Sequence, residues 1–344
     1  MRVMVTGNLG YIGTVLVPHL AARGHSVVGL DAGYYKDCLL TACEPPAEQI
    51  YKDVRHATID DFQGVDAIVH LAALSNDPLG ELAVQLTEAI NLHATMKVAK
   101  AAKAAGVKRF VYSSSQSMYG VSTTDAELEE DNAEKNPVTT YARTKWDAEL
   151  QLNALSDDDF CVTHMRPSTV FGASPRLRCD IVFNNLVACA FTTGQIQIKS
   201  DGTPWRPVIH VKDVCAAYVA GLEAPQSIVA ARAYNVGVPA GNYTVRDLAE
   251  AAQRAVPGSE LVFTGEHRDA RTYRVSFDRI HSELGEWFKP EWDLDKGGKE
   301  LVGFFQAINF TEADFQGPKC TRLLAIRQAV ERGEIDSELF VNAA

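Results

Sequence analysis

The chain has 344 residues, a hydrophobic content of 46% and a formal net charge of −11. This length suffices for one large α/β unit or two closely joined lobes with a buried core. The acidic residues are spread along the chain, which argues against a nucleic-acid partner, because such a partner requires a basic surface. An anionic ligand would therefore have to be held by a few local arginines or by helix N-termini.

The cysteines and the lack of long apolar runs indicate a reducing compartment such as the cytoplasm. There are seven cysteines, and none forms a CxxC pair, which favours buried free thiols in a reducing environment and argues against zinc. The chain enters a strand pattern at once with "MRVMVTG", which leaves no room for a signal peptide, and no apolar run reaches membrane-spanning length. We therefore expect a cytoplasmic protein with no metal site and no membrane partner.

Short β-rich runs alternate with longer helical patterns through the first half of the chain. The strand patterns cover residues 2–6, 25–31, 66–73, 108–115 and 161–167, and the helical patterns cover 11–24, 91–106 and 139–155. The strands are nearly continuous apolar runs, as a sheet buried on both faces requires. This alternation predicts an α/β fold with a parallel sheet between two layers of helices.

The pattern changes after about residue 167, where proline and glycine become frequent. A helical pattern at 180–194 is followed by one more strand pattern at 232–239, and a helix at 244–258 has Thr244 as its expected N-cap. We therefore predict a second, smaller lobe built from discontinuous segments. Beyond about residue 300 the sequence is amphipathic and gives no indication of chemistry.

A glycine-rich segment follows the first strand and opens the first helix. In "VTGNLGYIG", Gly7 allows a tight turn, Gly10 lets the backbone approach a pyrophosphate, and Gly13 permits close helix–sheet packing. Asp31 ends the next strand, where a carboxylate accepts hydrogen bonds from an adenosine ribose and repels a 2′-phosphate. The segment predicts a Rossmann-type, doubly wound sheet that binds a dinucleotide, and Asp31 favours NAD over NADP. Asp53, after a third short strand, is expected to meet the adenine amino group.

A tyrosine and a lysine lie four residues apart in "YARTK", on one face of the predicted helix. The pKa of a free tyrosine is about 10, too high for an efficient base at neutral pH. The ammonium of Lys145 and an oxidised nicotinamide ring would favour the phenolate of Tyr141. Tyr141 could then take a proton from a sugar hydroxyl, while Ser115, at the end of a strand, steadies the developing carbonyl.

With these motifs together, the sequence resembles the extended short-chain dehydrogenase/reductases of the nucleotide-sugar epimerase/dehydratase family. The resemblance runs over nearly the whole chain, through "TGNLGYIG", Asp31, "DVR" at 53–55, "HLAA" at 70–73, "SSSQSMYG", "YARTK", "RPSTVFG" and "DGTPWRPVIHVKDV". It implies that Ser115, Tyr141 and Lys145 form the catalytic set, that NAD stays tightly bound, and that the substrate is a nucleoside-diphosphate sugar. It also implies a homodimer.

The resemblance assigns the two lobes and the cofactor contacts. It implies an NAD-binding Rossmann domain at 1–166, to which segments near 206–237 return, and a nucleotide-sugar-binding lobe from 167–205 and 238–344. The expected cofactor residues are Gly7, Gly10, Tyr11, Ile12, Gly13, Asp31, Asp53, Val54, Leu71, Ala72, Ala73, Asn91, Ser113, Tyr141, Lys145 and Pro167.

The resemblance also indicates how a substrate diphosphate is held. Arg206 in "GTPWRPVIH" and Arg271 in "RDARTYRVSFD" match the family's phosphate-contacting arginines, with Arg268 and Arg274 as alternatives to Arg271. The planar guanidinium fork suits diphosphate oxygens, which supports the assignment. The other expected substrate contacts are Ser115, Gln116, Thr169, Asn184 and Asn185.

The residues after Ser115 distinguish between the reactions of the family. Its 4,6-dehydratases usually have Asp and Glu there, because eliminating water needs both an acid and a base. Gln116 cannot ionise and Ser117 is a very poor base, so chemistry that stops at a 4-keto sugar is favoured. We expect a 4-epimerase. A 4-ketoreductase is the alternative, a dehydratase or decarboxylase is less favoured, and a non-enzymatic NAD-sensing protein is disfavoured by the intact catalytic set.

Overall fold

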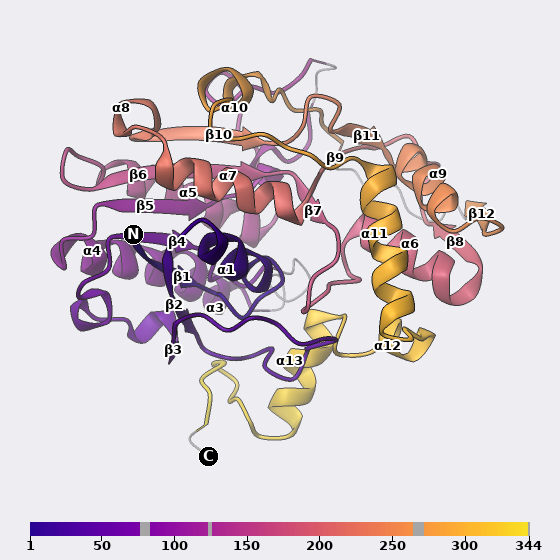
Figure 1. Ribbon diagram of the computed structural model, residues 1–344, viewed down its shortest axis with the longest axis horizontal. Helices are drawn as coiled ribbons and strands as arrows, with labels where there is room; N and C mark the ends of the chain where they lie inside the picture. The colour runs from indigo at the N-terminus through magenta and orange to yellow at the C-terminus, as the bar shows by residue number, and fades with distance from the viewer. Residues whose placement is uncertain (76–82, 123–125, 264–271, 343–344) are drawn as a thin grey trace.

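The computed structural model describes residues 1–75, 83–122, 126–263 and 272–342 (Figure 1). Seven strands form its main sheet: β1 (Arg2–Thr6), β2 (Ser26–Asp31), β3 (Glu48–Tyr51), β4 (Ala67–His70), β5 (Arg109–Ser113), β6 (Cys161–Pro167) and β10 (Arg232–Val236). All neighbours are parallel, in the order β10-β6-β5-β4-β1-β2-β3. This is the doubly wound order of a Rossmann-type sheet, so the predicted α/β fold class is confirmed.

The central strands are apolar throughout because both faces of the sheet are covered. In β1, Val3 and Val5 belong to the hydrophobic cluster on one face and Met4 belongs to the cluster on the other. Alternate side chains of a strand point to opposite faces, so a doubly buried strand has no polar face to present.

Helices form a layer on each face of the sheet (Figure 1). One layer contains α1 (Gly13–Ala22) and α7 (Val211–Glu223). The other contains α3 (Val84–Glu88), a π-helical segment (Ala89–Ala94), α4 (Thr95–Ala104) and α5 (Thr140–Asn153). A further element, α13 (Arg322–Glu331), packs Ile326 and Ala329 into this second cluster, to the lower right of β3 in the view of Figure 1.

The smaller lobe lies beside the carboxyl ends of the strands, on the right in Figure 1. It contains a sheet of β7 (Thr169–Phe171), β9 (Trp205–His210) and β11 (Asn242–Thr244), and a parallel pair of β8 (Gln195–Ile198) and β12 (Glu260–Phe263). The helices associated with it are α6 (Val182–Thr193), α9 (Val245–Ala255), α11 (Leu294–Ala307) and α12 (Glu312–Gln316), while α8 (Gln226–Val229) and α10 (Asp278–Glu283) flank β10.

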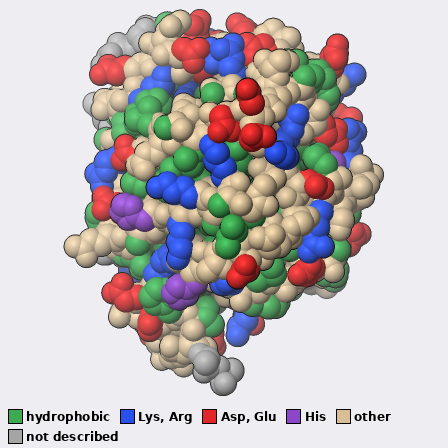
Figure 2. All heavy atoms as spheres, turned by 90° about the vertical axis from the view of Figure 1, so that its left-hand side faces the viewer, with side chains coloured by type: hydrophobic (Ala, Val, Ile, Leu, Met, Phe, Trp, Pro, Cys, Tyr) green, Lys and Arg blue, Asp and Glu red, His purple; other side chains and the backbone are tan. Residues whose placement is uncertain are grey.

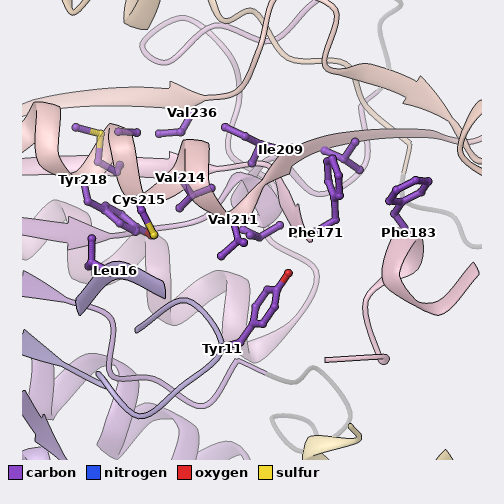
Figure 3. Packing of buried hydrophobic residues seen from close by; sticks show 14 of the residues in the cluster. Tyr11, Leu16, Phe171, Phe183, Ile209, Val211, Val214, Cys215, Tyr218 and Val236 are labelled. Carbon is purple, nitrogen blue, oxygen red and sulfur yellow. The ribbon is translucent and has the colours of Figure 1, made fainter. Parts of the chain in front are cut away.

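One hydrophobic cluster joins the two parts. Figure 3 shows Leu16 of α1 and Tyr218 of α7 at one end of the cluster, and Phe171 and Phe183 of the smaller lobe at the other. Because the apolar core is continuous across them, the lobes hold the loops at the strand ends in a fixed arrangement.

Several local expectations can be compared directly with the structure. Thr244 is the N-cap of α9, as predicted, and the structure adds a capping box with Asp247. All seven cysteines are free thiols, and Cys43 is the one that is not buried.

Within the described residues no helix is both long and apolar enough to cross a membrane. Figure 2 shows acidic and basic side chains interspersed on the face it presents. The domain boundaries, the homodimer and the cytoplasmic location stay predictions.

Candidate active site

A cavity of about 1040 Å³ lies at the carboxyl ends of the parallel strands, against the smaller lobe. Loops that follow β1, β2, β4, β5 and β6 line it. In doubly wound sheets, ligands bind at the point where the winding reverses, which here lies between β1 and β4. The topology therefore positions this cavity to bind a ligand.

The loop between β1 and α1 can exist only with glycine at its narrowest points. Gly7 has a φ of +74°, and a Cβ there would lie 2.8 Å from the backbone nitrogen of Ala72. A Cβ on Gly13 would lie 2.5 Å from the carbonyl oxygen of Gly7. The loop thus lies tightly against the segment after β4, and leaves its backbone and the N-terminus of α1 facing the cavity.

Asp31 connects the end of β2 to this loop. Its carboxylate accepts hydrogen bonds from the backbone nitrogens of Leu9 at 3.0 Å and Gly33 at 2.7 Å. Burial raises the pKa of Asp31, and these two bonds with the nearby Arg176 and Arg322 act in the opposite direction. The carboxylate lines the cavity, so it can also accept hydrogen bonds from a ligand hydroxyl.

Asp53 also lines the cavity, but its carboxylate already has protein partners. Arg55 donates to it at 2.7 Å and the Tyr34 hydroxyl donates at 2.9 Å. Burial by itself would raise the pKa of Asp53, but its contacts with Arg55 lower it. Asp53 therefore orients Tyr34 and Arg55 at this end of the cavity.

The three expected catalytic residues all line the cavity. Ser115 follows β5, and its Oγ accepts a hydrogen bond from the Ser117 nitrogen at 3.1 Å, which leaves its own O–H free to donate. Tyr141 and Lys145 lie one turn apart on α5. The Lys145 Nζ is 5.8 Å from the centre of the Tyr141 ring and donates to the Ser113 carbonyl at 2.6 Å. Lys145 is therefore held by the end of β5, directly beside Tyr141.

Lys145 is a buried cation without a carboxylate partner. Its side chain is 3% exposed, and no described carboxylate forms an ion pair with it. Burial lowers its pKa to about 7, although Glu149 on the same helix acts in the opposite direction. Such a group destabilises the fold whenever it is charged, which is typical of residues retained for function.

Lys145→Met in NAD-free protein is expected to increase the free energy of unfolding by about 1–2 kcal/mol at pH 7. The ordinary pKa of a lysine is 10.5 and the folded value is about 7, so the unfolded state binds more protons between these two values. Wild-type stability therefore rises with pH in that window, and the advantage of the variant shrinks toward pH 10. Urea unfolding at pH 7 and pH 10 measures both effects.

The exposed Lys100 on α4 gives a matched control, because Lys100→Met removes a solvated charge and should change little. A Lys145→Met protein less stable than wild type at pH 7 would contradict the prediction.

Gln116 does not line the cavity, contrary to its expected contact with substrate. Its amide nitrogen donates to the Arg166 carbonyl at 2.9 Å, and its amide oxygen accepts from the Ser168 hydroxyl at 3.1 Å. The side chain is 1% exposed and fixes the loops after β5 and β6 to each other. Ser117 lines the cavity instead, with a hydroxyl that has no hydrogen-bond partner among the described residues.

Two asparagines also support the cavity from behind rather than lining it. Asn91, expected at the cofactor, pairs its amide with both backbone polar groups of Leu74, at 2.8 and 3.1 Å. Asn184, expected at the substrate, accepts from the Gly172 nitrogen and donates to the Tyr11 hydroxyl. Both side chains are almost fully buried and hydrogen-bonded, and neither is among the residues that line the cavity.

The remaining expected cofactor residues line the cavity: Gly10, Tyr11, Ile12, Val54, Leu71, Ala72, Ala73, Ser113 and Pro167. The Tyr11 hydroxyl donates to the Gly172 carbonyl at 2.8 Å, and burial raises the pKa of this phenol far above its usual value. Tyr11 is therefore not a second base.

The expected substrate residues Thr169, Asn185 and Arg206 line the cavity from the side of the smaller lobe. Arg271 and Arg268 lie outside the described residues. Arg274, the other alternative, does not line the cavity, because it pairs with Glu127 at 2.8 Å and packs over the Trp205 ring.

Sequence reasoning missed several residues that line the cavity: Tyr34, Tyr35, Arg178, Asp180, Lys199, Tyr273 and Arg322. Arg178 belongs to the segment "ASPRLR", in which two basic residues could have been noticed next to an expected loop. Arg322 lies in α13 and has no motif around it.

Comparisons with known proteins agree with this geometry. The family model of the NAD dependent epimerase/dehydratase family matches residues 3–237. A UDP-glucose 4-epimerase of Mycolicibacterium smegmatis is 29% identical over 320 residues, which cover 89% of this chain and 99% of the relative. A dTDP-D-glucose 4,6-dehydratase of Mus musculus is 25% identical over 325 residues, which cover 89% of this chain and 88% of the relative. The structure of MoeE5 in complex with UDP-glucose and NAD matches this chain with a TM-score of 0.75 at 25% identity. The match covers 89% of this chain and 99% of the MoeE5 chain.

Proposed function

The chain belongs to the NAD-dependent epimerase/dehydratase family, and from that premise we propose that it is a nucleoside-diphosphate-sugar 4-epimerase with tightly bound NAD. Membership makes it an NAD-dependent enzyme. The relatives include both epimerases and dehydratases, so the reaction must be argued from the residues of this chain.

The residues around the cavity fit NAD. The loop of Gly7, Gly10 and Gly13 presents backbone and a helix N-terminus to the pyrophosphate, and Asp31 presents a carboxylate to the adenosine ribose. When bound, NAD supplies reversible oxidation at the sugar carbon. Lys145 and Ser113 lie at the opposite end of this row of residues, where the nicotinamide ribose is expected.

In this proposal Tyr141 takes the proton of the sugar 4-hydroxyl and later returns a proton to the same oxygen. In between, the sugar carbon has become a ketone, and the opposite face of that ketone is the one that is reduced. Lys145, buried beside it, favours the phenolate form that makes this possible. Ser115 donates a hydrogen bond to the oxygen as it becomes a carbonyl. Only one oxygen gains and loses a proton, so one base is enough.

A single observation favours epimerisation over elimination of water. Gln116 is turned away from the cavity toward the Arg166 carbonyl and the Ser168 hydroxyl, and Ser117 offers the cavity only a hydroxyl. Among the described residues, the carboxylates lining the cavity are Asp31 and Asp53 at the adenosine end and Asp180, which pairs with Arg178 at 2.9 Å. Neither residue after Ser115 thus carries a carboxyl group that could remove a C5 proton or protonate a leaving hydroxyl.

A sugar nucleotide fits the other half of the cavity. Arg206 of β9 and Lys199, next to β8, supply positive charge from the smaller lobe, where the protein as a whole is acidic. Guanidinium and ammonium groups bind diphosphate oxygens well. We propose that the diphosphate of the substrate lies against these two side chains.

Proton NMR of the purified enzyme with UDP-, dTDP-, CDP- and GDP-sugars, without added cofactor, tests the proposal. We expect one of these sugars to convert to its 4-epimer, because a retained NAD makes the reaction redox-neutral. Tyr141→Phe protein serves as the control for background conversion. Turnover that requires NADH and a 4-keto sugar would instead indicate a reductase, and loss of water from the sugar would indicate a dehydratase.

A further inference from the structure

The C-terminal segment packs against the adenosine end of the cavity. Ile326 of α13 belongs to the same buried cluster as the β2 residue Leu30. The Tyr34 hydroxyl lies 2.6 Å from the Leu339 carbonyl oxygen, and Arg55 donates to the Glu338 carbonyl at 2.7 Å. Residues 318–342 are therefore part of the wall behind Asp31 and Asp53, far along the chain from both.

This segment delivers a buried arginine to the cavity. Arg322 is 3% exposed and lines the cavity. Its guanidinium donates to the carbonyls of Arg176 at 2.7 Å and Lys319 at 3.4 Å, and it lies 4.5 Å from the centre of the Tyr35 ring. No described carboxylate forms an ion pair with it, and burial lowers its pKa.

An arginine stays charged in a protein, so this burial is costly unless a negative group compensates it. The two carbonyls and the aromatic ring compensate only in part. A cationic side chain that is both buried and open to a ligand cavity is suited to an anionic ligand.

The position of Arg322 indicates which anion this is. Arg176, whose carbonyl it contacts, also donates to the carbonyl of Leu9 in the glycine-rich loop. Arg322 also acts on the pKa of Asp31, the residue at the adenosine ribose. The residues proposed for the substrate diphosphate, Arg206 and Lys199, come instead from the smaller lobe.

We propose that Arg322 binds a phosphate of the dinucleotide, and that the C-terminal segment thereby holds NAD in the cavity. The inference rests on the proposed placement of NAD along the loops after β1, β2 and β4. It assigns a cofactor-retaining role to a segment whose sequence pattern indicates no chemistry.

Replacing Arg322 with Met tests the proposal, with Arg327→Met as the matched control. Arg327 lies on the same helix and is exposed. Isothermal titration of cofactor-stripped protein should show NAD affinity reduced about 10- to 100-fold in Arg322→Met, the range of a charge-assisted hydrogen bond. The affinity of the control for NAD, and of both variants for adenosine and UDP, should equal that of wild type.

The other possible results of these titrations would overturn the proposal. Equal NAD affinity in Arg322→Met and wild type would overturn it, whether or not the melting temperature falls, because a purely structural arginine changes stability and not affinity. Loss of UDP affinity alone would overturn it in favour of the substrate diphosphate. If Arg322→Met does not fold, hydrogen exchange of residues 318–342 in wild type decides, since NAD should slow exchange there and adenosine should not.

The same titrations separate this inference from the proposed function. A wild-type protein that binds NAD but epimerises no sugar nucleotide would contradict the epimerase and leave the role of Arg322 intact. A wild-type protein that does not bind NAD would contradict both.

Discussion

Tyr141→Phe is expected to reduce turnover by about 10²- to 10⁴-fold while leaving NAD bound. The substitution removes only the phenolic oxygen proposed to accept the sugar proton as a phenolate, and leaves the ring beside Lys145 in place. Ser115 cannot replace it, because an aliphatic hydroxyl is a far weaker base than a phenolate. The initial rate of epimer formation, with saturating sugar nucleotide, measures the loss, and the NAD released on denaturation measures cofactor content.

The exposed Tyr51 of β3 provides a control, because its side chain is 70% exposed and lies outside the cavity. Tyr51→Phe should retain full activity and full NAD content. Activity of Tyr141→Phe within a few-fold of wild type would remove Tyr141 from the mechanism. Loss of both activity and NAD would show that the tyrosine holds the cofactor rather than the proton.

The dinucleotide end of the cavity could be predicted because its constraints are local. Gly7, Gly10 and Gly13 act within one strand–turn–helix unit, and Asp31 ends the adjacent strand. Their spacing alone determines where the backbone must approach a ligand and where a carboxylate lies. The same locality explains why Tyr141 and Lys145, one helical turn apart, could be identified together.

The residues that sequence reasoning misplaced depend on contacts between distant segments. The sequence indicates that Gln116 cannot ionise, but its orientation is set by the Arg166 carbonyl and the Ser168 hydroxyl on another loop. Arg322 reaches the cavity only because α13 folds back against β2, which no local pattern predicts. Amphipathic periodicity identifies a helix and its buried face, but it does not identify the surface on which the helix packs.

Glu149→Gln is expected to lower the free energy of unfolding by about 3–5 kcal/mol, because it leaves Arg166 buried without its counter-charge. Glu149 lies on the helix of Tyr141 and Lys145 and accepts three hydrogen bonds from Arg166 of β6, at 2.9, 3.2 and 2.6 Å. The exposed fractions of the two side chains are 1% and 3%. Arg166 also donates to the Tyr119 hydroxyl, so the pair joins α5 to the sheet and to the loop after Ser115.

Urea unfolding measures this loss, and its pH dependence identifies the cause. Burial by itself would raise the pKa of Glu149, but Arg166 lowers it below the ordinary glutamate value of 4.5. The pair therefore stabilises the wild type above about pH 4.5, and that contribution falls as the pH drops through the folded value. The difference between wild type and Glu149→Gln should shrink accordingly in acid. A constant difference would indicate lost packing rather than a lost ion pair.

An exposed ion pair provides the comparison for the buried one. Arg254 and Asp295 are 2.9 Å apart, with side chains 57% and 55% exposed, so Asp295→Asn should change stability by less than about 1 kcal/mol. The double variant Glu149→Leu with Arg166→Met should recover part of the loss of Glu149→Gln, because it removes both buried charges. Its turnover should nevertheless stay low. The charged pair positions the helix face that presents Tyr141 and Lys145, and apolar side chains restore packing there without restoring those hydrogen bonds.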